Sequence, residues 1–262
     1  DGTSPLEADY LYWVGCAGSF DDKNKKVTQA MSKLLQRAGV SFAILGPSEM
    51  CTGDPARRSG NEYIFQMLAM QNVETLNGMG VKKIITQCPH CFNTLANEYP
   101  DMGGHYEVVH HSQFLEWLID QGKLDLSTAK LEERICYLGR HNDVYMSPRN
   151  VIGSLAGIEI VEAERNGTKG MCCGAGGARM WMEEHTGKQV NVERSQELIA
   201  TGASKIAVAC PFCYIMIHAH PRRHRSRGEG HDRGPRRCRG RLRPPRSWSS
   251  PTTEMPASCS PG

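Results

Sequence analysis

Five cysteines in the second half of the chain have types and spacings that suit a shared metal group. They are Cys136, Cys172, Cys173, Cys210 and Cys213. Free cysteines are usually buried one at a time as small hydrophobic residues, and two adjacent cysteines form a disulfide with each other only under severe strain. Thiolate sulfur is a soft ligand that selects zinc, copper(I) or iron–sulfur clusters. We therefore predict that these five sulfurs converge on one metal cluster.

The number of sulfurs bears on which metal they bind. A zinc site is almost always closed by four ligands, so a fifth sulfur favours a multi-iron cluster. The Gly-Ala-Gly-Gly stretch at residues 174–177 would let backbone N–H groups approach the sulfurs of such a cluster, where hydrogen bonds adjust the reduction potential. The alternative is a zinc-binding structural or interaction module without redox activity, in which the cysteines serve the fold.

Two other uses of the cysteines are weaker. A disulfide scaffold is usually much shorter than this chain of 262 residues. A dithiol oxidoreductase also places a Cys-Pro-x-Cys motif where a strand meets a helix, with the first thiol activated at the helix N-terminus. That motif occurs twice here, at residues 88–91 and 210–213, each time with further cysteines upstream that a dithiol enzyme does not need. We therefore favour metal binding.

The first half of the chain carries a matching set of cysteines. It consists of Cys16, Cys51, Cys88 and Cys91. Corresponding cysteines of the two halves lie 120 to 122 residues apart, so the chain is an internal repeat. Thr52 stands at the position of Cys173, so the first copy offers four sulfurs and the second offers five.

Hydrophobic spacing indicates that strands and helices alternate in both copies. In the first copy it predicts strands at residues 10–14, 40–45, 83–87 and 107–110, and helices at residues 22–38, 61–76 and 112–121. In the second copy it predicts helices at residues 148–155 and 183–201, and strands at residues 158–161 and 205–209. Residues 131–135 are mostly charged and give the second copy no obvious first strand.

This order of elements predicts an α/β fold with two tandem, pseudo-symmetric cysteine-rich repeats and mostly parallel sheets. We expect the first repeat to span residues 1–125 and the second to span residues 126–217. Several of the cysteines follow strands directly, and the carboxyl ends of parallel strands are where open α/β sheets place ligands. Such a fold can gather cysteines that are 36 residues apart in the sequence.

The balance of basic and acidic residues changes near residue 218. Residues 218–262 contain 11 Arg, no Lys and three acidic residues, whereas the preceding part contains 20 Lys and Arg against 25 acidic residues. We predict a disordered Arg/Pro-rich tail, and we interpret it as a non-native end and not as a basic extension for nucleic acid or acidic lipid. The mildly acidic remainder argues against nucleic-acid binding. No apolar run reaches the ~18 residues that a membrane span needs.

Histidines near the cysteines are candidates for a supporting role. His90 lies between two predicted ligands, and His110 and His111 end a predicted strand. His141 follows Cys136 by five residues. Surface or supporting positions are the ordinary explanation for such histidines, so we assign none of them as a ligand.

The cysteine motifs resemble those of a known family. The order Cys136-x35-Cys172-Cys173-Gly174-x35-Cys210-x2-Cys213 is similar to the cysteine-rich CCG domain. This domain occurs in the B subunit of heterodisulfide reductase and in iron–sulfur subunits of bacterial lactate, glycolate and glycerol-3-phosphate oxidation systems. Those proteins carry two tandem copies, and the resemblance covers about residues 10–217.

The resemblance implies which metal groups the cysteines bind. For the second repeat it implies a 4Fe–4S cluster of non-cubane type on all five cysteines. For the first repeat it implies zinc or a cubane cluster on Cys16, Cys51, Cys88 and Cys91, because Thr52 departs from the five-cysteine pattern. Arg134 and Ile135 stand where relatives have Asp-Pro before the first cysteine, which a short internal loss would explain.

The resemblance also implies an electron-transfer role in an oxidoreductase. The expected partner is a flavoprotein dehydrogenase or a ferredoxin-like protein, and the expected acceptor is a quinone or a disulfide. Many relatives carry an N-terminal ferredoxin-like domain and some carry membrane helices, so we expect this chain to need a partner for activity. We expect it in the cytoplasm, at the cytoplasmic face of the membrane where a partner anchors it.

Overall fold

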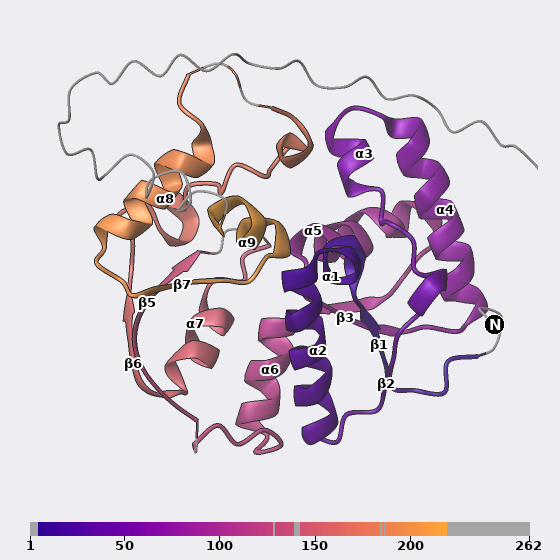
Figure 1. Cartoon of the computed structure of the whole chain (residues 1–262). Helices are drawn as coiled ribbons and strands as arrows, with labels where there is room; N and C mark the ends of the chain where they lie inside the picture. The colour runs from indigo at the N-terminus through magenta and orange to yellow at the C-terminus, as the bar shows by residue number, and fades with distance from the viewer. Residues whose placement is uncertain (1–4, 128, 139–141, 184, 186, 219–262) are drawn as a thin grey trace, which may run out of the picture.

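The first repeat is built on a parallel sheet with the strand order β2-β1-β3-β4. Its strands are β1 (Tyr10–Trp13), β2 (Phe42–Ala43), β3 (Lys83–Thr86) and β4 (Glu107–His110). The computed structural model describes residues 5–127, 129–138, 142–183, 185 and 187–218, and it gives only the backbone of residues 130–132 and 134–138. Figure 1 shows this sheet on one side of the molecule and the second repeat on the other.

The second repeat has a parallel sheet of its own, with the order β6-β5-β7. Its strands are β5 (Lys130–Leu138), β6 (Ala156–Val161) and β7 (Lys205–Val208). The expectation that this repeat has no obvious first strand is wrong, because β5 lies at the centre of the sheet. Glu133 of β5 is paired with Lys205 of β7, with 2.6 Å between Oε1 and Nζ. Pairing with two neighbouring strands therefore outweighs the low strand propensity of a charged run.

Helices connect the strands in both repeats. They are α1 (Gly15–Phe20), α2 (Asp22–Arg37), α3 (Asp54–Arg58), α4 (Glu62–Gly78), α5 (Pro89–Asn93), α6 (His111–Asp120), α7 (Met146–Gly153), α8 (Val190–Ala200) and α9 (Pro211–His218). The Asp21 side chain accepts hydrogen bonds from the backbone of Lys23 and Asn24, and Asn61 accepts one from Ile64. These two residues are N-caps, so α2 and α4 begin where the sequence predicts.

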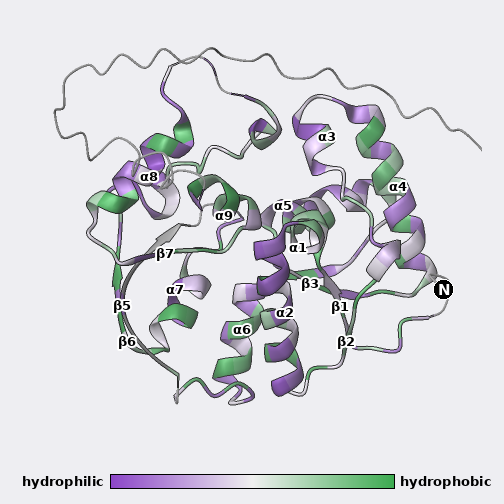
Figure 2. Ribbon diagram, in the orientation of Figure 1, coloured by the Kyte–Doolittle hydropathy of each residue, from purple (hydrophilic) through white to green (hydrophobic). Residues whose placement is uncertain are grey.

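Two hydrophobic clusters pack on opposite faces of the first sheet. Leu11 and Trp13 of β1 belong to the first cluster, and Tyr12 belongs to the second, because successive side chains of a strand point to opposite faces. The first cluster continues into the second repeat through Leu198 and Phe212. Figure 2 shows hydrophobic residues along α9, which contacts α1 of the first repeat. The two repeats therefore share one core.

The structure corrects three finer expectations. Strand β2 has only two residues, and α8 begins later than its predicted start. The spacing of apolar residues places Ile64, Met67 and Val73 on one face of α4, but of these three the structure buries only Val73, and Ile64 and Met67 are 43% and 53% exposed. Helix α4 is apolar around much of its circumference, so the spacing alone does not define its buried side.

Some expectations lie beyond what the structure describes. The tail expected at residues 218–262 is outside the described residues except for His218, the last residue of α9. The division between repeats at residues 125 and 126 falls between α6 and β5 and stays a prediction. Within the described ranges, no helix is both long enough and apolar enough to cross a bilayer.

Candidate metal centre

The cysteines of the first repeat lie where strands give way to helices or loops. Cys16 is in α1 directly after β1, and Cys51 is in the loop before α3. Cys88 is the N-cap residue of α5, and Cys91 lies in the first turn of that helix. Hydrogen bonds link the thiols of Cys16 and Cys51 and those of Cys88 and Cys91, and Cys91 also lies beside Cys16. The structure therefore brings these four sulfurs together.

Four cysteines of the second repeat meet in the same way at the end of β7. Cys172 and Cys173 lie in the loop that leads to α8, Cys210 directly precedes α9, and Cys213 lies in its first turn. The Cys213 and Cys173 Sγ atoms are 3.0 Å apart. Hydrogen bonds also link Cys173 to Cys172 and Cys213 to Cys210. The structure thus gathers four of the five sulfurs predicted for this repeat.

Cys136 has a different place in the fold. Its backbone lies within β5 and pairs with Ile206, and β5 continues to Leu138. In the first repeat Cys16 instead lies beyond Trp13, the last residue of β1. Because a strand rises about 3.3 Å per residue, the Cys136 backbone lies about 7 Å short of the end of its strand. The ligand role of Cys136 stays a prediction, and the strand register speaks against it.

The Cys-x-Gly loops of the two repeats contain the same hydrogen bond. The backbone N–H of Gly53 donates to Cys51 Sγ at 3.5 Å, and that of Gly174 donates to Cys172 Sγ at 3.3 Å. Both glycines are left-handed, with φ of 88° and 92°, which glycine adopts without steric cost. A Cβ atom at Gly174 would also lie 3.1 Å from the backbone nitrogen of Asn191. Glycine is therefore needed to aim this N–H group at the sulfur.

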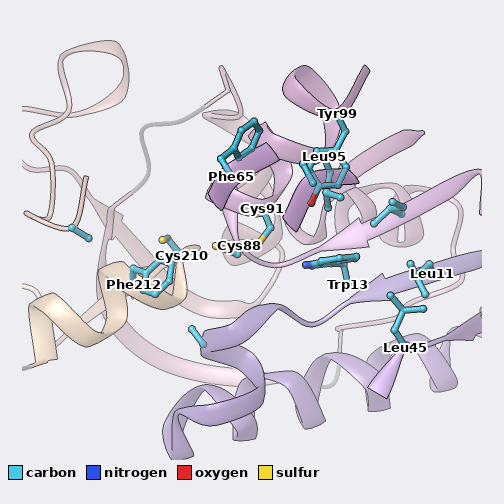
Figure 3. Close-up of a cluster of buried hydrophobic side chains, with 14 of the residues drawn as sticks. Leu11, Trp13, Leu45, Phe65, Cys88, Cys91, Leu95, Tyr99, Cys210 and Phe212 are labelled. Carbon is cyan, nitrogen blue, oxygen red and sulfur yellow. The ribbon is translucent and has the colours of Figure 1, made fainter. Parts of the chain in front are cut away.

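Sulfurs of the two repeats also contact each other. Cys88 of the first repeat is hydrogen-bonded to Cys210 of the second, and the two residues are 3% and 7% exposed. Figure 3 shows Cys88 and Cys210 near each other, with Cys91 further into the first repeat. Contacts between neighbouring thiols therefore join the eight cysteines whose side chains the structure describes into one continuous row of sulfurs. The sequence predicts two separate sites and gives no sign of this contact.

Two observations bear on whether the row fits an iron–sulfur group. In the described part of the chain, no three His, Cys, Asp or Glu side chains are arranged to hold a metal ion. The indole N–H of Trp13, a fully buried residue, has no hydrogen-bond partner there, and its nitrogen lies on the side of Cys88 and Cys91 in Figure 3. An unpaired buried donor costs about 1–3 kcal/mol. A sulfur-rich group bound beside Cys88 and Cys91 would offer it acceptors, so this buried donor is the observation that fits such a group.

Hydrogen bonds between thiols lower the pKa of at least one cysteine in each repeat. The hydrogen bond from Cys16 lowers the pKa of Cys51 to about 6, although burial acts in the opposite direction. Hydrogen bonds from Cys172 and Cys213 lower the pKa of Cys173, again against the effect of burial. The thiolate is the form that binds metals. Each repeat therefore contains a cysteine that is prepared to bind metal.

A half-buried carboxylate borders the sulfurs of the first repeat. Glu49 accepts hydrogen bonds from the backbone N–H of Val14 at 2.9 Å and of Gly15 at 2.5 Å. Burial raises the pKa of Glu49 to about 7, although these two hydrogen bonds lower it. Glu49 thus fixes the turn that carries Cys16. Sequence reasoning missed this residue because nothing in its neighbourhood distinguishes it from an exposed glutamate.

His90 is the histidine with the most direct contact to the sulfurs. Its Nδ1 lies 3.2 Å from Oδ2 of Asp54, and its ring is also hydrogen-bonded to Cys210. Burial alone would lower the pKa of His90, but these two partners raise it to about 10. Of the other histidines considered, His110 caps α6, and His141 lies outside the described residues.

The parallel sheets and the paired cysteine loops define a tandem cysteine-rich α/β protein. The chain belongs to the CCG cysteine-rich domain family, whose model matches residues 10–96 and 135–218. Each matched segment contains all of the ligands that the sequence predicts for one repeat. The resemblance noted from the motifs is therefore confirmed at the level of the family.

Three relatives of the chain are named as oxidoreductases or their subunits, one of them as iron–sulfur-binding. The chain is 47% identical over 216 residues to the probable iron-sulfur-binding oxidoreductase FadF of Bacillus subtilis, covering 80% of this chain and 30% of that protein. It is 47% identical over 222 residues to the EtfAB:quinone oxidoreductase of Syntrophomonas wolfei, covering 80% of this chain and 31% of that one. Identity to a subunit of the dihydromethanophenazine:CoB–CoM heterodisulfide reductase of Methanosarcina barkeri is 32% over 222 residues, covering 79% of this chain and 53% of that subunit. The chain thus spans about a third to a half of these relatives.

Proposed function

We propose that the chain is the iron–sulfur electron-transfer module of an oxidoreductase. The observation that carries this proposal is the row of eight sulfurs that crosses the junction of the two repeats. An iron–sulfur cluster, when bound, takes up and releases single electrons, with a potential that its surroundings adjust. The contact between Cys88 and Cys210 would bring the groups held by the two repeats close together.

Each repeat contributes one half of the row of sulfurs, and we propose a separate bound group for each half. For the second repeat we propose a 4Fe–4S cluster of non-cubane type held by Cys172, Cys173, Cys210 and Cys213. Cys136 is the fifth ligand that the sequence spacing suggests, and the register of β5 speaks against it. For the first repeat we propose zinc or a cubane cluster held by Cys16, Cys51, Cys88 and Cys91.

Residues around the sulfurs would hold and shield the bound groups. The N–H groups of Gly53 and Gly174 already donate to ligand sulfurs, and the Trp13 N–H is free to donate to an acceptor bound beside Cys88. Cys88 and Cys210 lie in the shared core, where little water reaches them. Hydrogen bonds and burial are the means by which a protein adjusts the potential of such a group.

We propose that the electrons pass between a flavoprotein dehydrogenase or ferredoxin-like partner and a quinone or disulfide acceptor, as in heterodisulfide reductase-like proteins. The names of two relatives, a quinone oxidoreductase and a heterodisulfide reductase subunit, support this class of acceptor. Because the chain corresponds to only part of those relatives, we propose that it is active only with a partner. Such a partner would hold it at the cytoplasmic face of the membrane.

Metal analysis tests the proposed function. The protein is purified without oxygen, and its iron, acid-labile sulfide and zinc are measured per chain. We expect iron and sulfide together, and no more zinc per chain than the first repeat alone can bind. A colourless protein that contains zinc alone would instead favour the zinc-stabilised interaction module.

A further inference from the structure

The sheet of the second repeat has one strand fewer, among the described residues, than the sheet of the first. Strand β3 lies between β1 and β4, whereas β7 pairs only with β5 in the part of the chain that the structure describes. The strands β3 and β7 correspond at an offset of 122 residues, which aligns Lys83 with Lys205. The side of β7 where a counterpart of β4 would lie is therefore a sheet edge, with backbone N–H and C=O groups directed outward.

The side chains of β7 are also less covered than those of β3. The last three residues of β3 are fully buried, whereas the last three residues of β7 are only half-buried. In the first repeat β4 pairs with β3, and α6, which follows β4, contacts β3 as well. A strand and a helix in the equivalent place would cover β7 in the same way.

Reciprocal contacts between the repeats indicate where the helix of such a segment would lie. Asn24 of α2 donates to the backbone carbonyl of Pro211 at 3.4 Å. Asn142, which precedes α7, donates to that of Pro89 at 3.3 Å. Helices α2 and α7 each connect the first two strands of their repeat, so each repeat makes the same contact with the other. Because α6 packs against α7 (Figure 1), a counterpart of α6 would pack against α2.

Helix α2 presents a basic side in this region. Four exposed basic residues are three, seven and four positions apart and therefore share one side of the helix, namely Lys23, Lys26, Lys33 and Arg37. Val27, on the same side, is 44% exposed and lines a cavity of about 60 Å³ with Val208 and Ala209. The basic side of α2 therefore adjoins the end of β7, and a helix that lies on it needs acidic side chains.

The segment that follows α9 has the wrong composition for this place. At the offset of 122, Gly230 and His231 stand where β4 has Val108 and Val109, and glycine is depleted in strands whereas valine is enriched. Residues 218–262 contain 11 Arg against three acidic residues, so the basic side of α2 would repel them. The chemistry of the site therefore favours a segment from another protein.

We propose that the edge of β7 and the basic side of α2 form a docking site for an acidic strand–helix segment of a partner protein. The segment adds a strand parallel to β7, with β-branched side chains at its centre, and lays an acidic helix along α2. Addition of a strand to a sheet edge is a recurrent mode of recognition, in which main-chain hydrogen bonds supply affinity and side chains supply specificity. The site uses no cysteine, so the inference does not depend on whether the protein binds metal.

A labelled peptide with the sequence of residues 104–121 is the probe for this site. These residues include the strand Glu107–His110 and an acidic helix, and they contain no Lys or Arg. We expect saturable binding to the full chain in fluorescence anisotropy, weakened about tenfold by Lys26→Glu combined with Lys33→Glu, because attraction becomes repulsion at two positions. Lys169→Glu, at an exposed lysine outside α2, is the control and should bind as wild type does.

A graft tests the same place without requiring the peptide to be structured in solution. Residues 219–262 are replaced by a second copy of residues 97–121, which keeps the offset of 122. The matched graft carries Val108→Gly and Val109→His within the copy, as the native tail does at those positions. We expect the first graft to melt at least about 4 °C above the second, because only the first can add a well-formed strand to β7.

Each outcome decides the inference. If the peptide does not bind, equal melting temperatures of the two grafts overturn the docking site, and a difference supports it. Peptide binding that appears only after residues 219–262 are removed would identify the tail as the occupant, and a dimer of the full chain that the peptide dissociates would identify a second copy. Either of these two results would overturn the assignment to a partner protein.

Discussion

Thr52 in the first repeat takes the place that Cys173 holds in the second. The Oγ1 atom of Thr52 lies 3.9 Å from Cys91 Sγ, and Cys173 Sγ lies 3.0 Å from Cys213 Sγ. Each contact joins the middle residue of a Cys-x-Gly loop to the last cysteine of a Cys-Pro-x-Cys motif. The two repeats therefore differ by one sulfur at equivalent points of the same loop.

Restoring that sulfur should change what the first repeat binds. Thr52 is 2% exposed and its hydroxyl already donates to Cys91, so Thr52→Cys places a thiol in the same contact without adding a larger side chain. Where zinc occupies the first repeat of the wild type, we expect it to give way to a cluster, so that zinc per chain falls and iron per chain rises about twofold. Thr52→Ser is the matched control and should leave the iron content as it is. Equal iron in Thr52→Cys and wild type would contradict the view that this position decides the metal.

Removing the corresponding sulfur should have the opposite effect in the second repeat. Cys173 is hydrogen-bonded to Cys172 and Cys213, and its pKa is lowered by those contacts. Cys173→Ser keeps a small polar side chain but loses a soft ligand. We expect this variant to lose the iron of the second repeat or to bind a different cluster, seen as lower iron content and a changed EPR spectrum. Unchanged iron and spectra would count against the ligand assignment.

The variant Cys136→Ser tests whether Cys136 is a metal ligand. The sequence spacing predicts that it is, and its position inside β5 indicates that it is not. The backbone of Cys136 pairs with Ile206 inside β5, so the register predicts iron content and EPR spectra equal to those of wild type. The sequence spacing predicts the loss of iron that we expect for Cys173→Ser. Iron analysis of the two variants side by side decides between them, and a loss in Cys136→Ser would show that β5 ends earlier in the metal-bound protein.

Glu49 should make the stability of the metal-free protein depend on pH. Its pKa rises from 4.5 to about 7 on folding, so the folded state binds the proton more tightly than the unfolded state does. The resulting stabilisation is fully present below pH 4.5 and is lost as the pH rises through 7, by up to about 3 kcal/mol. Urea unfolding at pH 5 and pH 8 should show this loss in wild type and in the exposed-site control Glu74→Gln, but not in Glu49→Gln. An identical pH dependence of unfolding in all three proteins would contradict the role of Glu49.

Local patterns predict much of the fold. Hydrophobic spacing predicts helices at residues 22–38 and 61–76, close to the observed α2 and α4, and the Cys-Pro-x-Cys motifs at residues 88–91 and 210–213 lie between strands and helices as expected. The central strand β5 could not be predicted, because its charged residues form a strand only when β6 and β7 pair with it. The strand depends on tertiary pairing and not on its own composition.

The sequence predicts which cysteines belong to the site, but it does not predict how they are arranged in space. Cysteine spacing identifies the sulfurs, but the contact between Cys88 and Cys210 depends on how the two repeats pack, which no local pattern records. The same holds for His90, which is distinguished from a surface histidine only by Asp54 and Cys210. Glu49 likewise becomes unusual only through burial.

A redox titration followed by EPR is the most direct test of whether this chain binds an electron-transfer group. Protein purified without oxygen is poised at a series of potentials, and its spectrum is recorded at each one. We predict a signal that appears and disappears reversibly, and that is lost or altered in Cys173→Ser. A protein that shows no signal at any potential and contains zinc as its only metal would contradict the assignment of this chain as an electron-transfer module.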